Sequence, residues 1–346
     1  MTITKFYMFI QCKNRKCFGV NQLLFLLISV AWLYSGAVNA KNSHVPSSLE
    51  KPMHCLAFSP YVDNLSPDYG AQPSKQLLGK LLDHVLKQTP FRCIMTYGVL
   101  GGLEDIFYEA QQRNIKVIAI LWIDNDPIVN TQSISKGIYL AREFKDTIIK
   151  VSCGSEVRTR RDYAYDKEIT RCLNALREAK ISQAISTIDT WWEWCNRSVS
   201  CQKTAFSEQV DWIGINIFPW WENIYSSLHD CVSAEHAADF HLARLEQVQR
   251  ANPGKEVIIT EFGWPANTTA QTGGGAGSCA TASLQNQALV VQSTLKKLAQ
   301  KKVTGVVFEA FSEQWKAAKE GGSGKFWGIC EGVAPYACNK YLNFGK

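Results

Sequence analysis

The sequence lacks the short motifs that mark many hydrolase and nucleotide-binding sites. It has no Gly-x-Ser-x-Gly turn, with which a serine hydrolase exposes its nucleophile. It has neither Gly-x-Gly-x-x-Gly nor Gly-Lys-Ser/Thr, and the glycine-rich run at residues 273–277 follows a polar stretch. The phosphate-binding turn of a dinucleotide or nucleoside triphosphate site is therefore missing, and we expect that run to be a loop.

Histidine is scarce, and its six occurrences show no metal-binding spacing. No His-Glu-x-x-His exists, and His236 and His241 are five residues apart, which would not place them on one helix face. The sequence also contains no Cys-x-x-Cys pair, which could have anchored a zinc ion. Cys153 could act as a nucleophile only with a histidine partner, which the sequence does not place. We expect neither a metal nor a cofactor.

Long apolar runs are absent except near the amino terminus. Residues 23–34 are apolar but for Ser29, and small residues follow at 38–40. A basic leader without acidic residues precedes the run, with Lys5, Lys13, Arg15 and Lys16. Because a membrane span needs about 18 apolar residues, we predict a cleaved secretory signal peptide at 1–40 rather than an anchor. A polar stub, 41–52, follows. We expect a secreted protein without a membrane partner, extracellular or in the cell wall, or periplasmic in a Gram-negative host.

A large positive charge is absent from the chain that remains. Four of the 37 Lys and Arg residues lie in the predicted signal peptide, and all 31 acidic residues lie beyond it, so the net charge falls from +6 to +2. The basic cluster at residues 158–161 is too short to bind nucleic acid, which needs a broad local excess of Lys and Arg. We expect no nucleic-acid partner. We also expect the protein to be a monomer.

Ten of the twelve cysteines lie after residue 40, an even number that suits an oxidising compartment. Two close pairs are predicted to form disulfide loops, and a third pair is a further candidate: Cys195 with Cys201, Cys330 with Cys338, and Cys231 with Cys279. Cys55, Cys93 and Cys153 lie inside apolar runs, so we expect them to be buried thiols.

Short apolar runs alternate eight times with amphipathic helical patterns. The predicted strands are 54–59, 91–97, 115–122, 148–153, 184–189, 211–217, 256–261 and 303–310. The predicted helices include 74–87, 103–114, 134–144, 165–179, 234–250 and 281–300. Continuous apolar strands are typical of sheets covered on both faces. The pattern predicts an α/β protein with a single (β/α)8 barrel over residues 53–346. A doubly wound open sheet is the alternative, although it usually has fewer strands.

Carboxylates and aromatic residues gather where the predicted strands end, which is where such barrels place their active sites. The predicted substrate-binding residues are Tyr61, Tyr97, Trp122, Asp189, Trp191, Asn216, Trp220, Trp264, Glu309 and Trp315. Aromatic rings stack on the apolar faces of sugars, and carboxylates supply acid, base and nucleophile. The grouping favours carbohydrate chemistry.

Glu156 and Glu261 follow the fourth and seventh predicted strands. Burying an ionised carboxylate after an apolar strand costs free energy, so such a residue is expected to have a function. In a closed eight-stranded barrel these two positions face each other across the mouth. Glycoside hydrolysis needs two carboxylates placed in this way, so we predict that Glu156 and Glu261 are catalytic.

Six segments together resemble glycoside hydrolase family 17, in particular its bacterial and fungal β-1,3-glucan hydrolases and glucanosyltransferases. They read AFSPYVDNLSPDYGAQPS, GLEDI, CGSEVRTR, INIFPWWENI, VIITEFGWP and FEAFSEQWKAAKEG, and they run in order from about residue 53 to 332. The resemblance implies a (β/α)8 barrel, a retaining mechanism and a β-1,3-glucan polysaccharide as substrate. It implies Glu156 as acid/base and Glu261 as nucleophile, with Tyr61, Glu309 and Trp315 lining the groove.

Three positions differ from the pattern of that family. Ser155 stands where Asn usually precedes the acid/base, Met95 where the second strand usually carries Arg, and Phe218 where the sixth-strand motif usually has Tyr. Each exchange removes a hydrogen-bonding group, which could cost about ten- to a thousandfold in rate. The sequence therefore predicts an enzyme, with a weakly active or inactive β-glucan-binding relative as the alternative.

Overall fold

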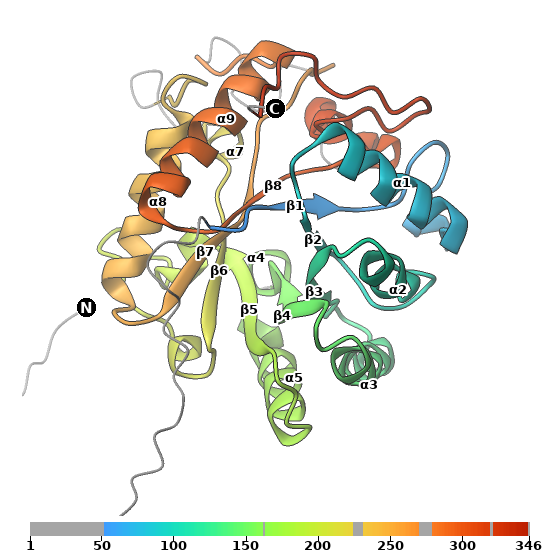
Figure 1. Cartoon of the computed structure of the whole chain (residues 1–346). Helices are drawn as coiled ribbons and strands as arrows, with labels where there is room; N and C mark the ends of the chain where they lie inside the picture. The colour runs from blue at the N-terminus through green and yellow to red at the C-terminus, as the bar shows by residue number, and fades with distance from the viewer. Residues whose placement is uncertain (1–51, 162, 224–230, 270–278, 319–320, 345–346) are drawn as a thin grey trace, which may run out of the picture. The chain divides into compact units, whose positions relative to one another are not determined.

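Eight parallel strands close into a barrel in the computed structural model of this chain (Figure 1). They pair in chain order, and β1 also pairs with β8, which closes the ring. The strands are β1 Cys55–Phe58, β2 Cys93–Thr96, β3 Lys116–Leu121, β4 Ile148–Ser155, β5 Ala184–Thr190, β6 Trp212–Asn216, β7 Glu256–Phe262 and β8 Gly305–Val307. The predicted (β/α)8 barrel is confirmed.

The structure describes residues 52–161, 163–223, 231–269, 279–318 and 321–344. The predicted signal peptide and all but the last residue of the predicted stub lie outside these residues, as does the glycine-rich run at 273–277. Among the described residues, no helix combines the length and the apolar character that crossing a membrane requires.

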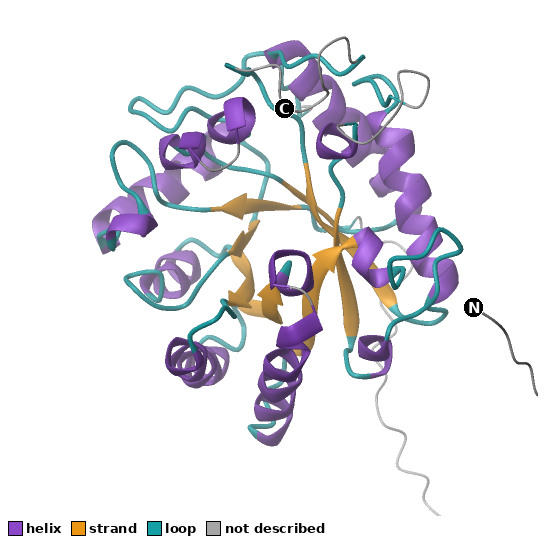
Figure 2. Ribbon diagram, turned by 180° about the vertical axis from the view of Figure 1, so that it is seen from behind, coloured by secondary structure: helices purple, strands orange, loops and turns teal. Residues whose placement is uncertain are grey.

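Helices surround the barrel, as Figure 2 shows from behind. The longer ones are α1 Lys75–Gln88, α2 Asp105–Gln112, α3 Pro127–Glu143, α5 Asp166–Glu178, α8 Ala237–Ala251 and α9 Leu284–Lys301. Short helices follow individual strands: α4 Val157–Arg161, α6 Trp191–Trp194, α7 Pro219–Glu222, and the 3-10 turns η1 Pro67–Tyr69, η2 Tyr163–Tyr165, η3 Ala205–Glu208, η4 Gln314–Ala318 and η5 Gly321–Phe326.

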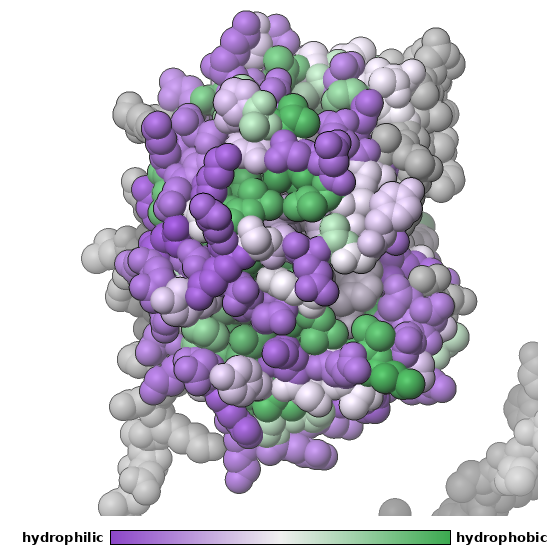
Figure 3. All heavy atoms as spheres, turned by 90° about the vertical axis from the view of Figure 1, so that its right-hand side faces the viewer, coloured by the Kyte–Doolittle hydropathy of each residue, from purple (hydrophilic) through white to green (hydrophobic). Residues whose placement is uncertain are grey.

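The apolar runs form strands because both of their faces are buried. Alternate strand residues point into the barrel, where Ala57, Met95, Ile118 and Trp212 belong to one buried cluster. Their neighbours in the chain point outward and pack under the helices in a larger cluster. The outer face of the helices is mixed, and Figure 3 shows apolar patches separated by hydrophilic residues on one side of the molecule.

Helix α3 begins seven residues before its predicted start. The Asp126 side chain accepts hydrogen bonds from the backbone N–H groups of Ile128 and Val129, and Pro127 occupies the first turn. Ile128 and Val129 are apolar but exposed, so this first turn does not show the apolar and polar faces by which a helix is predicted. The extra turns bring Val129 and Ser133 to the end of β3, close to the site described below.

All ten cysteines after residue 40 are joined in disulfides. The three predicted pairs are confirmed: Cys195–Cys201, Cys231–Cys279 and Cys330–Cys338. The prediction of buried thiols at Cys55, Cys93 and Cys153 is wrong, because Cys55 bonds Cys93 and Cys153 bonds Cys172. The first of these pairs joins neighbouring strands inside the barrel, and the second fastens β4 to α5. A paired cysteine is as apolar as a buried thiol, so the surrounding sequence looks the same in both cases.

The disulfide inside the barrel should stabilise the fold more than the short loop does. Cys55 and Cys93 are 38 residues apart, whereas Cys195 and Cys201 are six apart. The chain-entropy relation gives about 4 kcal/mol for the first and about 2 kcal/mol for the second. We expect Cys55→Ala/Cys93→Ala to lower the free energy of unfolding in urea more than the matched pair Cys195→Ala/Cys201→Ala. An equal or reversed order would contradict the placement of the barrel disulfide.

Candidate active site

A cavity of about 600 Å³ opens where the strands end, and both predicted catalytic glutamates line it. Its wall comes from the ends of β1 to β4, β7 and β8 and from the loops and helices that follow them. The lining residues are Ser59, Tyr61, Pro67, Tyr97, Gly98, Val99, Leu100, Gly101, Leu103, Trp122, Val129, Ser133, Ser155, Glu156, Arg160, Glu261, Phe308, Glu313, Trp315 and Lys316. The size suits a small-molecule or oligosaccharide site.

A sharp turn after β4 presents Glu156. Gly154 and Glu156 both have positive φ, of 80° and 53°. A side chain at Gly154 would meet Val157 Cγ2 at 2.3 Å, so glycine is required there. The left-handed conformation is unfavourable for glutamate, and residues held in it cluster at functional sites. The backbone N–H of Glu156 donates to the Ile188 carbonyl at 2.9 Å and holds the turn.

Asn216, the last residue of β6, donates through Nδ2 to Glu156 Oε1 at 3.0 Å. The Thr260 hydroxyl donates to Asn216 Oδ1 at 2.7 Å, which fixes the orientation of the amide. Burial raises the pKa of Glu156, while the bond from Asn216 and the charge of Arg160 act to lower it. Glu156 is therefore a carboxyl group that can hold a proton at a higher pH than an exposed glutamate.

Glu261 lies at the end of β7 and is almost completely buried. Tyr97, which follows β2, donates its hydroxyl proton to Glu261 Oε1 at 2.9 Å. Burial, followed by the charges of Glu261 and Glu309, raises the pKa of Tyr97 well above its usual value. Tyr97 therefore stays protonated as a donor, and this bond stabilises the ionised form of the Glu261 carboxylate.

A buried lysine and two glutamates form a second polar cluster on the loop after β8. Lys316 Nζ lies 2.9 Å from Glu309 Oε2 and 2.6 Å from Glu313 Oε2. Glu313 also accepts hydrogen bonds from Ser59 Oγ and from Trp315 Nε1. Burial raises the pKa of Glu309, whereas for Glu313 Lys316 and the hydrogen bonds outweigh burial and lower the pKa. The cluster holds Trp315 and Lys316 at the cavity wall.

Four predicted substrate-binding residues line the cavity: Tyr61, Tyr97, Trp122 and Trp315. Asn216 reaches the site through Glu156. The other five predicted residues do not belong to the cavity wall: Asp189, Trp191, Trp220, Trp264 and Glu309.

These five residues are absent from the cavity wall because other parts of the protein cover them. Trp220 and Trp264 are 1% and 0% exposed and pack edge to face with centroids 5.3 Å apart. Trp191 donates its Nε1 proton to Glu222 at 2.7 Å, and Glu309 is covered by Lys316. Asp189, whose pKa burial raises to about 7, accepts hydrogen bonds from Arg158 N and Thr159 Oγ1, so it anchors α4.

Sequence reasoning missed three charged residues of the wall, Arg160, Glu313 and Lys316. The segments CGSEVRTR and FEAFSEQWK contain them, but only the fold shows that they turn toward the cavity. Arg160 pairs with Asp124 at 3.2 Å, stacks on Trp122 at 4.2 Å from the ring centroid, and donates to the carbonyls of Ile123 and Ser155. These contacts hold its guanidinium in one place beside Glu156.

The three departures from the resembled family occupy different places. Ser155 lines the cavity beside Glu156. Met95 is completely buried in the barrel interior. Phe218 packs edge to face against Phe308 and Trp327, with centroids 5.4 and 5.1 Å apart. The hydroxyl that reaches Glu261 comes instead from Tyr97.

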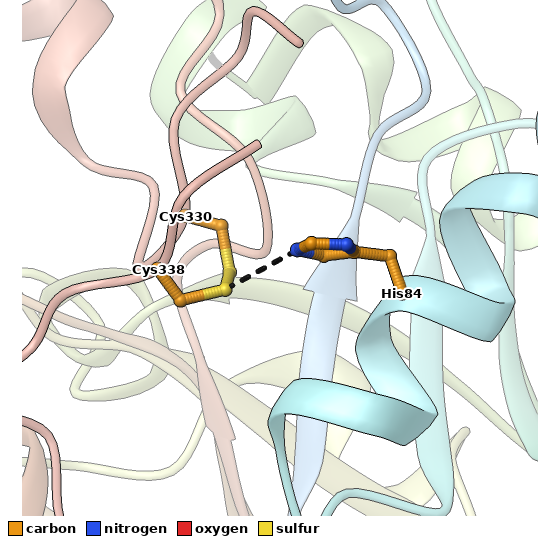
Figure 4. A group of neighbouring side chains, drawn as sticks. All are labelled: His84, Cys330 and Cys338. Atoms are coloured by element: carbon orange, nitrogen blue, oxygen red, sulfur yellow. Dashed lines mark hydrogen bonds between the residues drawn. A yellow bond between two sulfur atoms is a disulfide. The ribbon is translucent and has the colours of Figure 1, made fainter. Parts of the chain in front are cut away.

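One group of side chains in the described part of the chain has the spacing of metal ligands: His84, Cys330 and Cys338. Figure 4 shows the His84 ring pointing at Cys338, with Nε2 3.5 Å from its sulfur. Both cysteines belong to one disulfide, so neither can offer the thiolate that a metal ion would bind. The group therefore supports no metal site.

The fold and site define a two-carboxylate barrel of the kind found in glycoside hydrolases. Residues 55–328 match the BtgE/BtgC glycoside hydrolase domain, so the chain belongs to that family. This agrees with the resemblance to glycoside hydrolase family 17.

Two curated relatives are fungal. The chain is 25% identical over 287 residues to the cell surface mannoprotein MP65 of Candida albicans, covering 79% of this chain and 65% of the relative. It is 22% identical over 298 residues to the probable beta-glucosidase btgE of Aspergillus terreus, covering 85% of this chain and 48% of the relative. The chain thus spans less than two thirds of the length of either relative.

Two solved structures share the fold. One is a glycoside hydrolase family 17 beta-1,3-glucanosyltransferase from Rhizomucor miehei, with TM-score 0.65, 18% identity, and coverage of 84% of this chain and 97% of that chain. The other is an endo-laminarinase from Formosa Hel1_33_131, with TM-score 0.66, 18% identity, and coverage of 81% and 83%.

Removing the guanidinium of Arg160 should raise the pKa of Glu156. The positive charge favours the ionised carboxylate, so Arg160→Gln shifts the balance toward the protonated form. Side-chain 13C NMR of labelled glutamate would measure the titration. Arg158→Gln is the matched control, because Arg158 lies on the same short helix but pairs with Asp166. An unchanged or lowered Glu156 pKa in Arg160→Gln would refute the assignment.

Proposed function

We propose that this protein is a secreted retaining glycosidase that acts on β-1,3-glucan, by hydrolysis, glucanosyl transfer or both. Glu156 acts as the acid/base and Glu261 as the nucleophile. The observation that carries the proposal is that two carboxylates, one directly after β4 and one at the end of β7, line one cavity, and each accepts a hydrogen bond from a neutral donor.

The surroundings of the two carboxyl groups support these roles. The raised pKa of Glu156 favours a group that carries a proton to the leaving oxygen. The hydroxyl of Tyr97 favours an ionised Glu261, which a nucleophile must be. The two groups of the same type thus have different surroundings, which suits the different roles that glycosidase mechanisms give them.

The reaction then runs in two displacements. Glu261 attacks the anomeric carbon while Glu156 transfers its proton to the departing glycosidic oxygen, which leaves a glycosyl ester on Glu261 and an ionised Glu156. Glu156 next takes a proton from water, or from a sugar hydroxyl in transfer, and that oxygen displaces Glu261. The second step restores both groups to their starting states.

The cavity wall supports a sugar chain as the substrate. Trp122, Trp315 and Tyr61 offer aromatic surface, and Tyr61 and Trp315 pack edge to face with centroids 6.5 Å apart. The choice of β-1,3-glucan rests on the family and on the activities of two structural neighbours, a glucanosyltransferase and an endo-laminarinase.

Five disulfides support secretion, because such bonds persist in oxidising compartments. The relative named as a cell surface mannoprotein fits a position at the cell surface or wall. We infer that the mature protein works outside the cytoplasm, and its monomeric state stays a prediction.

A β-glucan-binding protein without turnover is the second candidate. Ser155, Phe218 and Met95 favour it, because each lacks a hydrogen-bonding group that the resembled family has near the site. The bond from Tyr97 to Glu261 favours the enzyme, since it supplies the nucleophile with a donor from another strand.

Glu261→Gln should abolish turnover of laminarin while binding of laminari-oligosaccharides persists. The amide keeps the shape of the side chain but cannot attack the anomeric carbon. Reducing-end release and transfer products would measure turnover, and calorimetry would measure binding. Glu178→Gln, an exposed glutamate on α5, is the control and should keep wild-type activity. If the wild type and Glu261→Gln bind alike and neither cleaves any β-1,3-glucan, the binding protein is the correct choice.

The first sugar released should be the β-anomer. A retaining mechanism inverts the anomeric carbon twice, and it requires carboxyl groups about 5 to 5.5 Å apart. Proton NMR during the first minutes of laminarin hydrolysis would detect the anomer before mutarotation. Early release of the α-anomer, or a carboxyl separation beyond about 6.5 Å in a crystal structure, would indicate inversion and contradict the role of Glu261.

A further inference from the structure

The turn that presents Glu156 is also the start of the short helix α4. The Glu156 carbonyl accepts the N–H of Arg160 at 2.8 Å, so Glu156 occupies the capping position directly before Val157. A capping residue usually has an extended backbone, and its side chain accepts a hydrogen bond from an N–H group of the first turn. Glu156 instead has the left-handed conformation, and its carboxyl group lines the cavity and bonds Asn216. The side-chain cap of α4 must therefore come from another residue.

Asp189, on the neighbouring strand β5, supplies this cap. Its Oδ2 accepts the backbone N–H of Arg158 at 2.9 Å, and its Oδ1 accepts the hydroxyl proton of Thr159 at 2.6 Å. Arg158 and Thr159 are the second and third residues of α4, which is where a capping side chain normally binds. Asp189 is 3% exposed, so water does not compete for these bonds. A buried carboxylate from one strand thus does for α4 what the side chain of Glu156 does not do.

Consecutive residues of β5 hold the chain on both sides of the Glu156 side chain. The backbone N–H of Glu156 donates to the Ile188 carbonyl, and Asp189 holds the first turn of the helix that follows. A glutamate persists in the left-handed conformation only where the surrounding contacts fix it. Arg160, whose charge acts on Glu156, is carried by the same five-residue helix. The orientation of the carboxyl group and the place of this cation therefore both depend on the bonds that Asp189 accepts.

We propose that Asp189 is a positioning residue for the acid/base: by capping α4 from β5, it holds the Glu156 carboxyl group in the orientation that proton transfer to the glycosidic oxygen requires. This inference rests on the proposed function of Glu156. Proton transfer needs the donor within hydrogen-bond reach of the leaving oxygen, so a small displacement of Glu156 lowers the rate. Asp189, which does not line the cavity, acts on the reaction through Glu156 and not through the sugar.

Two leaving groups separate this role from a general effect on the fold. The sugar oxygen of laminarihexaose needs a proton from Glu156 in order to leave, whereas 2,4-dinitrophenolate leaves a laminaritrioside without one. In Asp189→Asn, either orientation of the amide turns its NH2 group toward a backbone N–H, that of Arg158 or that of Thr190. We expect kcat/KM of the full-length protein to fall about ten- to hundredfold for laminarihexaose and less than about threefold for 2,4-dinitrophenyl β-laminaritrioside.

Asp166→Asn is the matched control, because it removes the ion pair with the Arg158 side chain but leaves the cap from Asp189 in place. It should keep the wild-type kcat/KM for both substrates. An equal loss for both substrates in Asp189→Asn, or no loss, would overturn the positioning role while the proposed function stands. If the wild type cleaves neither substrate, the proposed function fails and the inference fails with it. Should Asp189→Asn not fold, Thr159→Val decides: it removes one bond to Asp189 from an exposed residue and should show the same dependence on the leaving group, with a smaller loss.

Discussion

Burying two carboxyl groups beside one cavity is the constraint on which the rest of the site depends. Transfer of an ionised carboxylate from water into a protein is unfavourable by several kcal/mol unless hydrogen bonds or charges compensate. Here Asn216 and Tyr97 compensate as neutral donors. Lys316, a buried cation of the cavity wall, is instead engaged by Glu309 and Glu313. A neutral donor stabilises a carboxylate without locking it in an ion pair, so a proton can still be gained and lost.

Aromatic packing surrounds Tyr97, whose hydroxyl donates to Glu261. Phe308 contacts Tyr97, Phe218 and Trp327 edge to face, so one ring joins the end of β2 to the start of α7. Phe218 fills its place in this wall without a hydroxyl group. Tyr97 packs edge to face on the same Phe308 ring and donates its hydroxyl proton to the Glu261 carboxylate. Tyr97 thus supplies Glu261 with a hydrogen-bond donor, whereas Phe218, which follows β6, has no hydroxyl group to offer.

The barrel could be predicted because strands covered on both faces need apolar residues at nearly every position. The position of Glu156 and Glu261 at the mouth of the barrel could be predicted because each follows or ends an apolar run. The binding residues were harder, since a tryptophan after a strand can turn into the cavity, as Trp122 does, or under a helix, as Trp264 does. The disulfides of Cys55 and Cys153 depend on which strands and helices meet, which local sequence does not contain.

The wall of the cleft is also the meeting place of segments far apart in the chain. Tyr336 donates its hydroxyl proton to Asp63 at 2.8 Å, and the Asp63 N–H donates to the Gly332 carbonyl at 2.6 Å. The Cys330–Cys338 disulfide closes the loop that carries Tyr336. Asp63 lies two residues after Tyr61, and Cys330 pairs with Phe311, which leads to Glu313. The cleft therefore depends on residues 330–338, which follow both glutamates in the chain, so a chain that stopped before them would have both glutamates but no finished groove.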